Sequence, residues 1–183
     1  DYPGSKLDLI AVPDFAMGAM ENVGAVTFRE TLLLIDVEKA TRSELSRSIS
    51  VIAHELAHMW FGDLVTMDWW DGIWLNEAFA SLMEVIASEA TYPEFKLWNE
   101  MNQDRSRGFG VDSLKSSRPV EFEVKSPEEA EEMFDVLTYQ KGSTVLRMFE
   151  TFIGEENFKK GVRSYLNKYE YKNTHSSDLW NEL

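Results

Sequence analysis

The 183-residue sequence contains no cysteine, few basic residues and no long hydrophobic run. Without cysteine, neither disulfide bonds nor thiolate metal sites can form. No stretch approaches the roughly 20 apolar residues that a membrane-spanning helix needs. We therefore expect no membrane segment in this chain. The absence of cysteine is also compatible with the cytoplasmic location that we predict.

The charge balance is strongly acidic. Only 18 Lys and Arg residues stand against 32 Asp and Glu, which gives a formal net charge of −14. Proteins bind nucleic acids and anionic membrane surfaces largely through Lys and Arg, so we expect neither as a partner. An acidic surface instead attracts cationic groups, such as the free amino terminus of a peptide. The alternative, that the excess charge only maintains solubility, stays open.

The order of the patterns along the chain predicts the fold class. Apolar and β-branched stretches bounded by Gly and Pro predict strands at 7–12, 25–28 and 31–35. Strands followed by helices are typical of an α+β fold. We expect residues 1–183 to form a single domain, with a sheet part at 1–40 and a helical part at 41–183.

Apolar residues recur at helical spacing from about residue 43 onward. Further helices are expected at 73–89 and 158–169, and the best candidate for a long loop is 108–125. The chain begins abruptly and stops within a predicted helix, so we expect it to be a fragment of a longer, multidomain protein.

A metal-binding pattern lies in the helix predicted after residue 43. The segment His54-Glu55-Leu56-Ala57-His58 is an HExxH motif. On a helix, residues i and i+4 share one face, so both imidazoles can reach the same ion. Glu55 can then face a metal-bound water as a general base. The motif therefore predicts a catalytic metal site rather than a structural one.

A catalytic zinc ion takes three protein ligands and keeps one position for water. Glu77 is the candidate third ligand, since it follows His58 after 18 intervening residues near the start of the next predicted helix. HExxH alone also occurs by chance, and a buried histidine is more often a hydrogen-bonded core residue. However, this chain has only three histidines, and two of them lie in the motif.

The surroundings of the motif favour metal binding over chance. Between Ser48 and Gly62 there is no Lys or Arg, and Glu55 is the sole carboxylate. This helix is therefore expected to be buried on most sides, where unpaired polar groups are costly. Glu84 and Asp63 are candidate partners for the ligand histidines. For Glu84, we favour a solvated helix face over such a role.

Three motifs together resemble one family. They are Gly18-Ala19-Met20-Glu21-Asn22, the HExxH-x18-E pattern, and Tyr139-Gln140-Lys141-Gly142. In order and spacing they resemble the zinc aminopeptidases of the aminopeptidase N family, and most closely the puromycin-sensitive and tricorn-interacting aminopeptidases. The resemblance runs along essentially the whole chain. It implies a thermolysin-like catalytic domain, one Zn²⁺ ion and additional domains on either side.

The resemblance also implies roles for individual residues. Glu21 would bind the α-ammonium group of a peptide with a free N-terminus. Its neighbours in the same motif would line the path of the peptide, namely Gly18, Ala19, Met20 and Asn22. Tyr139 would donate a hydrogen bond to the oxyanion while a zinc-activated water hydrolyses the N-terminal peptide bond. From the residues alone, neither Glu21 nor Tyr139 would stand out.

Some departures and alternatives accompany the resemblance. Val23, Met59 and Ala78 stand where many family members have Trp, Gln and Gly. None of these positions carries an atom of the expected chemistry. A thermolysin-like endopeptidase would share the zinc site without using Glu21, and a relative with additional epoxide hydrolase activity shares these motifs. A catalytically silent peptide-binding module is the alternative outside enzymes.

Overall fold

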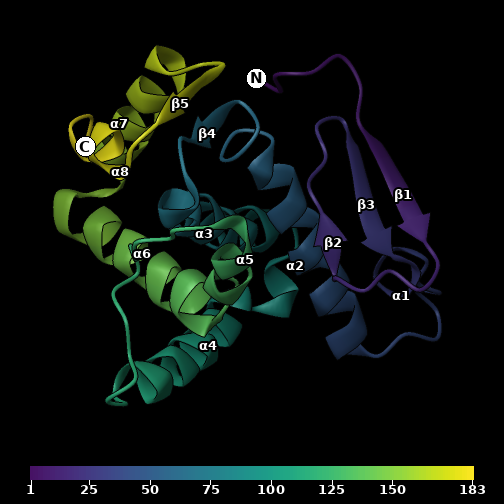
Figure 1. The fold of residues 1–183 in the computed structure, drawn as a ribbon. Helices are drawn as coiled ribbons and strands as arrows, with labels where there is room; N and C mark the ends of the chain where they lie inside the picture. Colours follow the sequence, from purple (N-terminus) through teal and green to yellow (C-terminus); the bar gives the residue numbers. More distant parts are fainter.

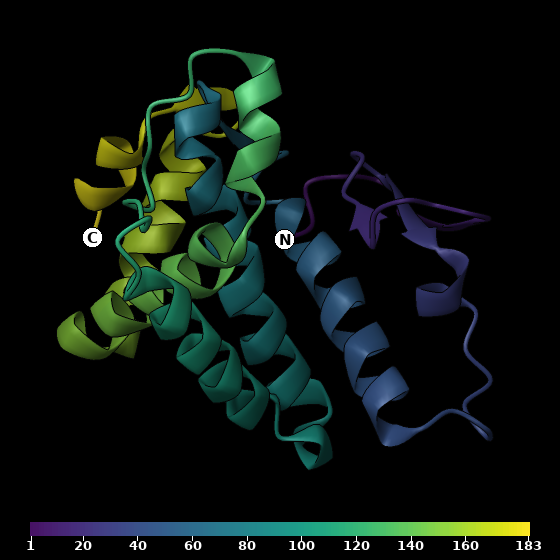
Figure 2. The same ribbon diagram turned by 60° about the horizontal axis from the view of Figure 1, so that its bottom comes forward.

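A computed structural model describes residues 1–183, the whole of the sequence. A small sheet lies on one side of the molecule, and most of the remaining chain is helical (Figure 1). The long helix α2 (Arg42–His58) lies between the sheet and the other helices (Figure 2). The predicted α+β class is confirmed. None of the helices is both long and apolar enough to cross a membrane.

The sheet consists of β1 (Asp8–Val12), β2 (Ala19–Met20) and β3 (Ala25–Arg29), in the order β1-β3-β2. β3 is the central strand and pairs parallel with β1 and antiparallel with β2. Val26 and Phe28 of β3 are fully buried against the α2 side of the molecule. Because β2 is an edge strand, one of its two backbone edges has no strand partner.

The strand predicted at 31–35 is wrong. The chain leaves β3 directly into the single helical turn α1 (Glu30–Leu33), which buries Leu32 and leaves Leu34 70% exposed. β3 is already paired on both sides, by β1 and β2, so the segment that follows it directly cannot pair with β3 as a further strand. The hydroxyl of Ser48 on α2 donates to the Leu32 carbonyl at 2.5 Å and ties this turn to the helix.

Helix α2 is defined at both ends by local chemistry. Thr41 and Glu44 form a capping box, in which the Glu44 amide donates to the Thr41 hydroxyl and the Thr41 amide donates to the Glu44 carboxylate. The helix ends at His58, and the chain reverses through Gly62, whose φ of +135° disfavours any residue with a side chain. This reversal brings the Phe61 carbonyl back towards the last turn of α2.

The remaining elements form the helical part. In chain order they are β4 (Val65–Met67), η1 (Trp70–Gly72), α3 (Ile73–Thr91), η2 (Pro93–Phe95), α4 (Leu97–Asp112), α5 (Pro127–Ala130), η3 (Glu131–Met133), a π-helical turn (Leu137–Lys141), α6 (Gly142–Ile153), α7 (Glu155–Lys168), β5 (Lys172–Thr174) and α8 (Ser176–Trp180). β4 and β5 pair in parallel. The predicted helices at 73–89 and 158–169 are confirmed, whereas the expected long loop is shorter because α4 continues to Asp112.

Helix α3 is the centre of the main core. It packs against α2 on one side and against α6 and the π-turn on another. Its many apolar residues explain this position, since their burial stabilises the core, while a polar stripe that includes Glu77 and Glu84 faces the histidines of α2. The fully or nearly fully buried residues of this core include Trp74, Leu75, Phe79, Leu82, Leu146, Phe158, Val162, Tyr165 and Leu179.

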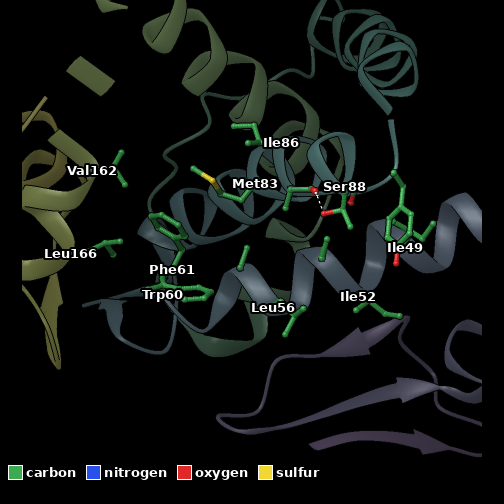
Figure 3. Close-up of a pocket in the computed structure, with 15 residues that line it drawn as sticks. Ile49, Ile52, Leu56, Trp60, Phe61, Met83, Ile86, Ser88, Val162 and Leu166 are labelled. Atoms are coloured by element: carbon green, nitrogen blue, oxygen red, sulfur yellow. Dashed lines mark hydrogen bonds between the residues drawn. The ribbon is translucent and has the colours of Figure 1, made fainter. Parts of the chain in front are cut away.

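The apolar face of α2 is less buried than the sequence suggests. Ile49, Ile52, Leu56 and Trp60 are only partly buried and line an open apolar cavity of about 580 Å³ between α2, α3 and α7 (Figure 3). His54 and Glu55 do not line it, because they lie on the other side of the helix. We expected α2 to be buried on most sides. This is correct for the face that carries Glu55 and His58, but the apolar face with Ile49, Ile52 and Leu56 is only partly buried.

The contact between α3 and α6 depends on a glycine. A Cβ atom added at Gly142 would lie 2.9 Å from the Cβ of Ala78. We expect Gly142→Ala to lower the stability by about 1–3 kcal/mol, because two packed helices would have to separate. Thermal denaturation of the full-length gene product measures the effect.

Gly110→Ala provides the matched control. Gly110 also lies within a helix, α4, but no atom lies within 4 Å of its added Cβ. Alanine there should be neutral or stabilising by up to about 1 kcal/mol. Equal shifts of the unfolding midpoint in the two variants would contradict the packing argument.

Candidate metal centre

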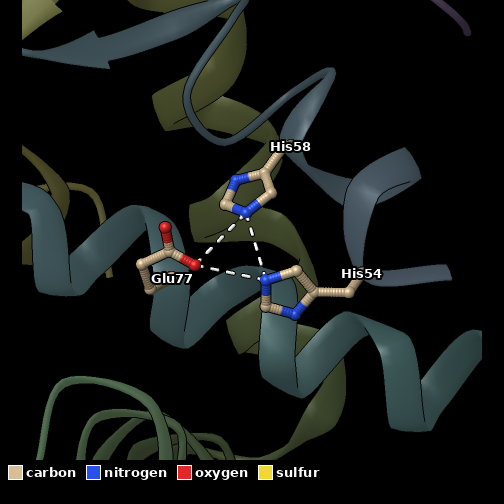
Figure 4. Close-up of side chains that lie close together, drawn as sticks. All are labelled: His54, His58 and Glu77. Atoms are coloured by element: carbon tan, nitrogen blue, oxygen red, sulfur yellow. Dashed lines mark hydrogen bonds and ion pairs between the residues drawn. The ribbon is translucent and has the colours of Figure 1, made fainter. Parts of the chain in front are cut away.

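Three side chains from α2 and α3 converge on one point (Figure 4). The Nε2 atoms of His54 and His58 are 3.2 Å apart, and the Glu77 Oε2 atom lies 3.2 Å from the first and 3.3 Å from the second. His58 and Glu77 are 1% and 4% exposed. The i, i+4 spacing on α2 and the packing of α3 against α2 together create this cluster.

The hydrogen bond of each Nδ1 atom determines whether the Nε2 atom of the same ring faces the cluster with a lone pair or with a proton. His58 Nδ1 lies 2.9 Å from the Phe61 carbonyl oxygen, and His54 Nδ1 lies 2.9 Å from Glu84 Oε2. A carbonyl and a carboxylate can only accept, so both Nδ1 atoms donate. In the neutral rings, both Nε2 atoms then carry lone pairs that point at each other and at the Glu77 carboxylate.

Three converging lone pairs require a positive charge between them. Two ligand atoms bound at 2.0–2.1 Å to a tetrahedral zinc ion lie roughly 3.3 Å apart, which agrees with the three separations in this cluster. A cluster of two imidazoles and one carboxylate is also a ligand set that zinc prefers. His54, His58 and Glu77 therefore fit a zinc ion in both chemistry and spacing.

The protonation equilibria of the cluster show the same preference for positive charge. Burial opposes the charged form of His54, but its hydrogen bonds to Glu77 and Glu84 outweigh this and raise its pKa to about 10. Burial likewise opposes ionisation of Glu77, but hydrogen bonds from both histidines prevail and lower its pKa to about 2. In the absence of metal, a bound proton takes the place of the metal ion between these lone pairs.

Glu55 lies beside the cluster without joining it. Its side chain is 7% exposed, and its Oε2 atom has no hydrogen-bond partner in the protein. Burial raises the pKa of this carboxyl to about 7, while the two neighbouring histidines act in the opposite direction. A buried carboxylate oxygen without a partner is costly, so its partner is expected to come from a ligand.

Tyr139 approaches the same point from the π-turn. Its ring stacks on the imidazole of His54, with ring centres 5.9 Å apart and an angle of 26° between the planes. Burial, followed by the charges of Glu77, Glu21 and Glu55, raises the pKa of its hydroxyl above the usual range. The hydroxyl therefore stays protonated at neutral pH and can donate a hydrogen bond.

A polar cavity of about 770 Å³ connects these groups to the edge of the sheet. Gly18 and Ala19 line it at one side, and His54, Glu55 and Tyr139 line it at another. Residues of α4 also line it. An extended peptide that added to the free edge of β2 would thus lie beside the metal-binding cluster.

The other residues of the β2 motif do not line this cavity. Met20 is 43% exposed, and the Asn22 amide donates to the Thr27 hydroxyl at 3.3 Å and to the Met20 carbonyl at 3.4 Å. Glu21 contributes negative charge near the site, because it raises the pKa of Glu55, Asp63 and Tyr139. Asn22 stabilises the turn that carries Glu21.

Of the two carboxylates considered as partners of the ligand histidines, Glu84 contacts one of them and Asp63 contacts neither. Glu84 is not on a solvated face: its side chain is 24% exposed and its carboxylate accepts from His54. The Asp63 carboxylate does not reach either histidine, and its Oδ2 atom is buried without a partner. The sequence did contain a signal for Glu84, since residues i and i+7 on a helix share one face and Glu77 is the other member.

An α+β fold with two histidines and a glutamate converging from adjacent helices defines a metallopeptidase domain. The Peptidase family M1 domain matches residues 1–183, and the chain belongs to this family. The family resemblance predicted from the three motifs is thereby confirmed.

Known aminopeptidases cover the whole chain. It is 50% identical over 183 residues to probable aminopeptidase 2 of Sulfurisphaera tokodaii, of which it covers 23%. It is 50% identical over 182 residues to endoplasmic reticulum aminopeptidase 2 of Homo sapiens and 48% identical over 183 residues to puromycin-sensitive aminopeptidase of Caenorhabditis elegans, covering 19% of each. The chain thus spans about a fifth of the length of these relatives.

The hydrogen bond from His54 to Glu84 generates a prediction about metal affinity. We expect Glu84→Gln to weaken zinc binding by about 10- to 100-fold, because a neutral partner orients the imidazole less firmly and makes it less basic. Competition with a chelator of known affinity measures the change.

Asp63→Asn is the matched control for this experiment. It also neutralises a partly buried carboxylate near the cluster, but one that touches no ligand histidine. Its zinc affinity should stay within a few-fold of the unsubstituted protein. If both variants lost affinity equally, the general negative charge and not the orienting hydrogen bond would be responsible.

Proposed function

We propose that this chain carries the catalytic site of a zinc aminopeptidase, which hydrolyses the N-terminal peptide bond of peptides. The observation that carries the proposal is the convergence of a metal-binding cluster, an unpartnered buried carboxylate oxygen and a tyrosine hydroxyl at one wall of a cavity edged by β2. The names of the relatives agree with it.

His54, His58 and Glu77 would hold one zinc ion. When bound, zinc lowers the pKa of a coordinated water towards about 7 and polarises a carbonyl group. The hydrogen bonds from the two Nδ1 atoms to Phe61 and Glu84 keep the imidazoles in the tautomer that presents Nε2 to the ion. These outer contacts also fix the ring planes, so the ligand atoms need little rearrangement on binding.

Glu55 would act as the general base and then as the general acid of the reaction. Its unpartnered oxygen is available to accept a proton from the attacking water, and its raised pKa near 7 suits both acceptance and return. It then delivers this proton to the departing amine, which leaves the carboxylate ready for another cycle. Glu77, the carboxylate of the cluster, would be occupied as a metal ligand and so is not free for this role.

Tyr139 and β2 would hold the substrate around the reacting bond. The Tyr139 hydroxyl, kept protonated by its surroundings, donates to the developing oxyanion. The backbone groups of the Gly18-Ala19-Met20 segment that do not pair with β3 would pair with the peptide as an added strand at the free edge of β2. The substrate is thereby aligned along the cavity before the bond is broken.

Glu21 makes the site an exopeptidase. It lies directly after the edge strand, and its charge reaches the site residues. A carboxylate at this position pairs with the free α-ammonium group and so fixes the scissile bond one residue from the N-terminus. An endopeptidase would have no use for this charge. Asn22 supports this arrangement by holding the turn.

The catalytic unit is proposed to be residues 1–183, acting together with flanking domains of a longer protein. The matched relatives are several times longer than this chain, which supports such domains. Peptides with a free N-terminus are the proposed substrates. The cytoplasmic location stays a prediction, since the relatives include one named for the endoplasmic reticulum.

The exopeptidase assignment predicts a requirement for a free amino group. In the full-length gene product, free peptides should lose residues one at a time, whereas the same peptides with an acetylated N-terminus should resist cleavage. Acetylation removes the charge with which Glu21 pairs, and mass spectrometry of the products follows the reaction. Comparable cleavage of both peptides would show an endopeptidase instead.

The separate roles of Glu55 and Glu77 predict two different defects. Glu55→Gln should abolish turnover yet retain zinc, because the proton acceptor is lost while the ligands remain. Glu77→Ala should lower the zinc content itself, because only the two imidazoles would hold the ion. Metal analysis and hydrolysis of free aminoacyl-anilides distinguish the two. Normal zinc content in Glu77→Ala would refute its assignment as the third ligand.

A further inference from the structure

Tyr139 lies in an unusual backbone segment. The turn Leu137–Lys141 is π-helical and leads directly into α6. A π-turn accommodates one extra residue, which rotates the side chains before it by about 100° relative to a continuous α-helix. The position of the Tyr139 ring over His54 therefore depends on this turn being maintained.

An ion pair between Arg118 and Asp135, whose side chains are 16% and 38% exposed, holds the start of the π-turn. The Asp135 Oδ1 atom accepts from the amides of Leu137 and Thr138 at 2.9 and 3.0 Å. Arg118 Nη2 donates to the same Oδ1 atom at 2.7 Å and to the Thr138 hydroxyl at 3.0 Å. Thr138 is fully buried, and the Arg118 side chain is 16% exposed. These contacts fix the residue immediately before Tyr139.

A second ion pair holds the end of the same turn. Lys141 Nζ donates to Asp112 Oδ1 at 2.6 Å and to the Arg118 carbonyl at 3.2 Å. Ser117 also donates to Asp112 Oδ1, at 2.5 Å. Residues of the segment from Asp112 to Arg118 therefore form hydrogen bonds with the π-turn on both sides of Tyr139. It begins the connection from α4 to α5, which passes in front of α6 in Figure 1.

This arrangement places positioning groups outside the cavity. Arg118 and Asp135 do not line the cavity and do not contact the metal-binding cluster. Their bonds go to the π-turn and to backbone carbonyls beside it. Charge-assisted hydrogen bonds of this kind are stronger than neutral ones and lose more when one partner is removed. A π-turn that is not held can relax towards regular α-helical geometry.

We propose that Arg118 and Asp135 are positioning residues, which hold the π-turn so that the Tyr139 hydroxyl is directed at the reacting carbonyl. The inference rests on the proposed role of Tyr139 in the aminopeptidase reaction. Displacing a catalytic group by about 1 Å can reduce the rate by roughly 100-fold. An ion pair that never touches the substrate can therefore control the rate of the chemical step.

Kinetics of the full-length gene product test this proposal with a free aminoacyl-anilide. We expect Asp135→Ala and Arg118→Ala each to lower kcat by about 10- to 100-fold, with KM and zinc content changed less than about two-fold. Arg118→Lys keeps the charge and should restore part of kcat. It also serves as the second variant if the alanine variants fold poorly.

The decisive comparison uses Tyr139→Phe as a background. Tyr139→Phe alone should lower kcat by about 100- to 1,000-fold. If Asp135 acts through this hydroxyl, adding Asp135→Ala should lower kcat less than about three-fold further. A full additional loss in this background would overturn the proposal, because the ion pair would then act through other groups or through stability alone.

Arg147→Ala is the matched control. Arg147 also forms an ion pair, with Glu150 at 2.6 Å, but it lies on α6 beyond the π-turn and contacts neither Tyr139 nor the cavity. Its removal should lower the unfolding temperature without changing kcat. A similar loss of kcat in Arg147→Ala would mean that any loosening of this region impairs the reaction.

A structural measurement separates this proposal from the proposed function. In a crystal structure of Asp135→Ala, the Tyr139 ring should no longer stack on His54, and an unchanged ring would overturn the proposal. If the unsubstituted protein failed to cleave free N-termini, the aminopeptidase assignment would fall. The crystal structure would still decide whether Asp135 positions Tyr139.

Discussion

The site depends on one electrostatic constraint, the convergence of three lone pairs from His54, His58 and Glu77. The Phe61 carbonyl and Glu84 fix the tautomers, so the facing nitrogens have no protons to share in their neutral state. A metal ion, or in its absence a bound proton, resolves this arrangement. The buried position of the cluster makes the requirement stricter, since little solvent is present to screen the repulsion.

The packing of the sheet and of α3 against α2 supports this constraint. The sheet packs on one side of this helix, and α3, packed against α2, is in turn held by α6 through the close approach at Gly142. The same approach brings the π-turn, and with it Tyr139, towards His54. The candidate metal ligands, the proposed proton acceptor and the proposed oxyanion donor therefore come from three different elements. Their relative placement is a property of the packed core.

Much of the fold and site was predictable because it depends on local spacing. The i, i+4 histidines share a helix face whatever the surroundings, and the α+β class followed from the order of the patterns. The strand predicted at 31–35 is wrong because β3 is already paired on both sides and the chain turns directly into the helical turn α1. Glu84 was assigned to solvent although it shares a helix face with Glu77, because the sequence could not reveal how closely α2 packs against α3.

The sequence by itself determined the family, the helix that carries the two histidines and the candidate ligand set, since these depend on residue identity and short-range periodicity. Only the tertiary structure decided which polar groups orient these ligands and how Tyr139 reaches them. Arg118 and Asp135 are separated from each other by a long connection, and the π-turn that they hold has no signature in side-chain periodicity. Such contacts arise when distant segments pack together, so their energetic role becomes visible only in the folded chain.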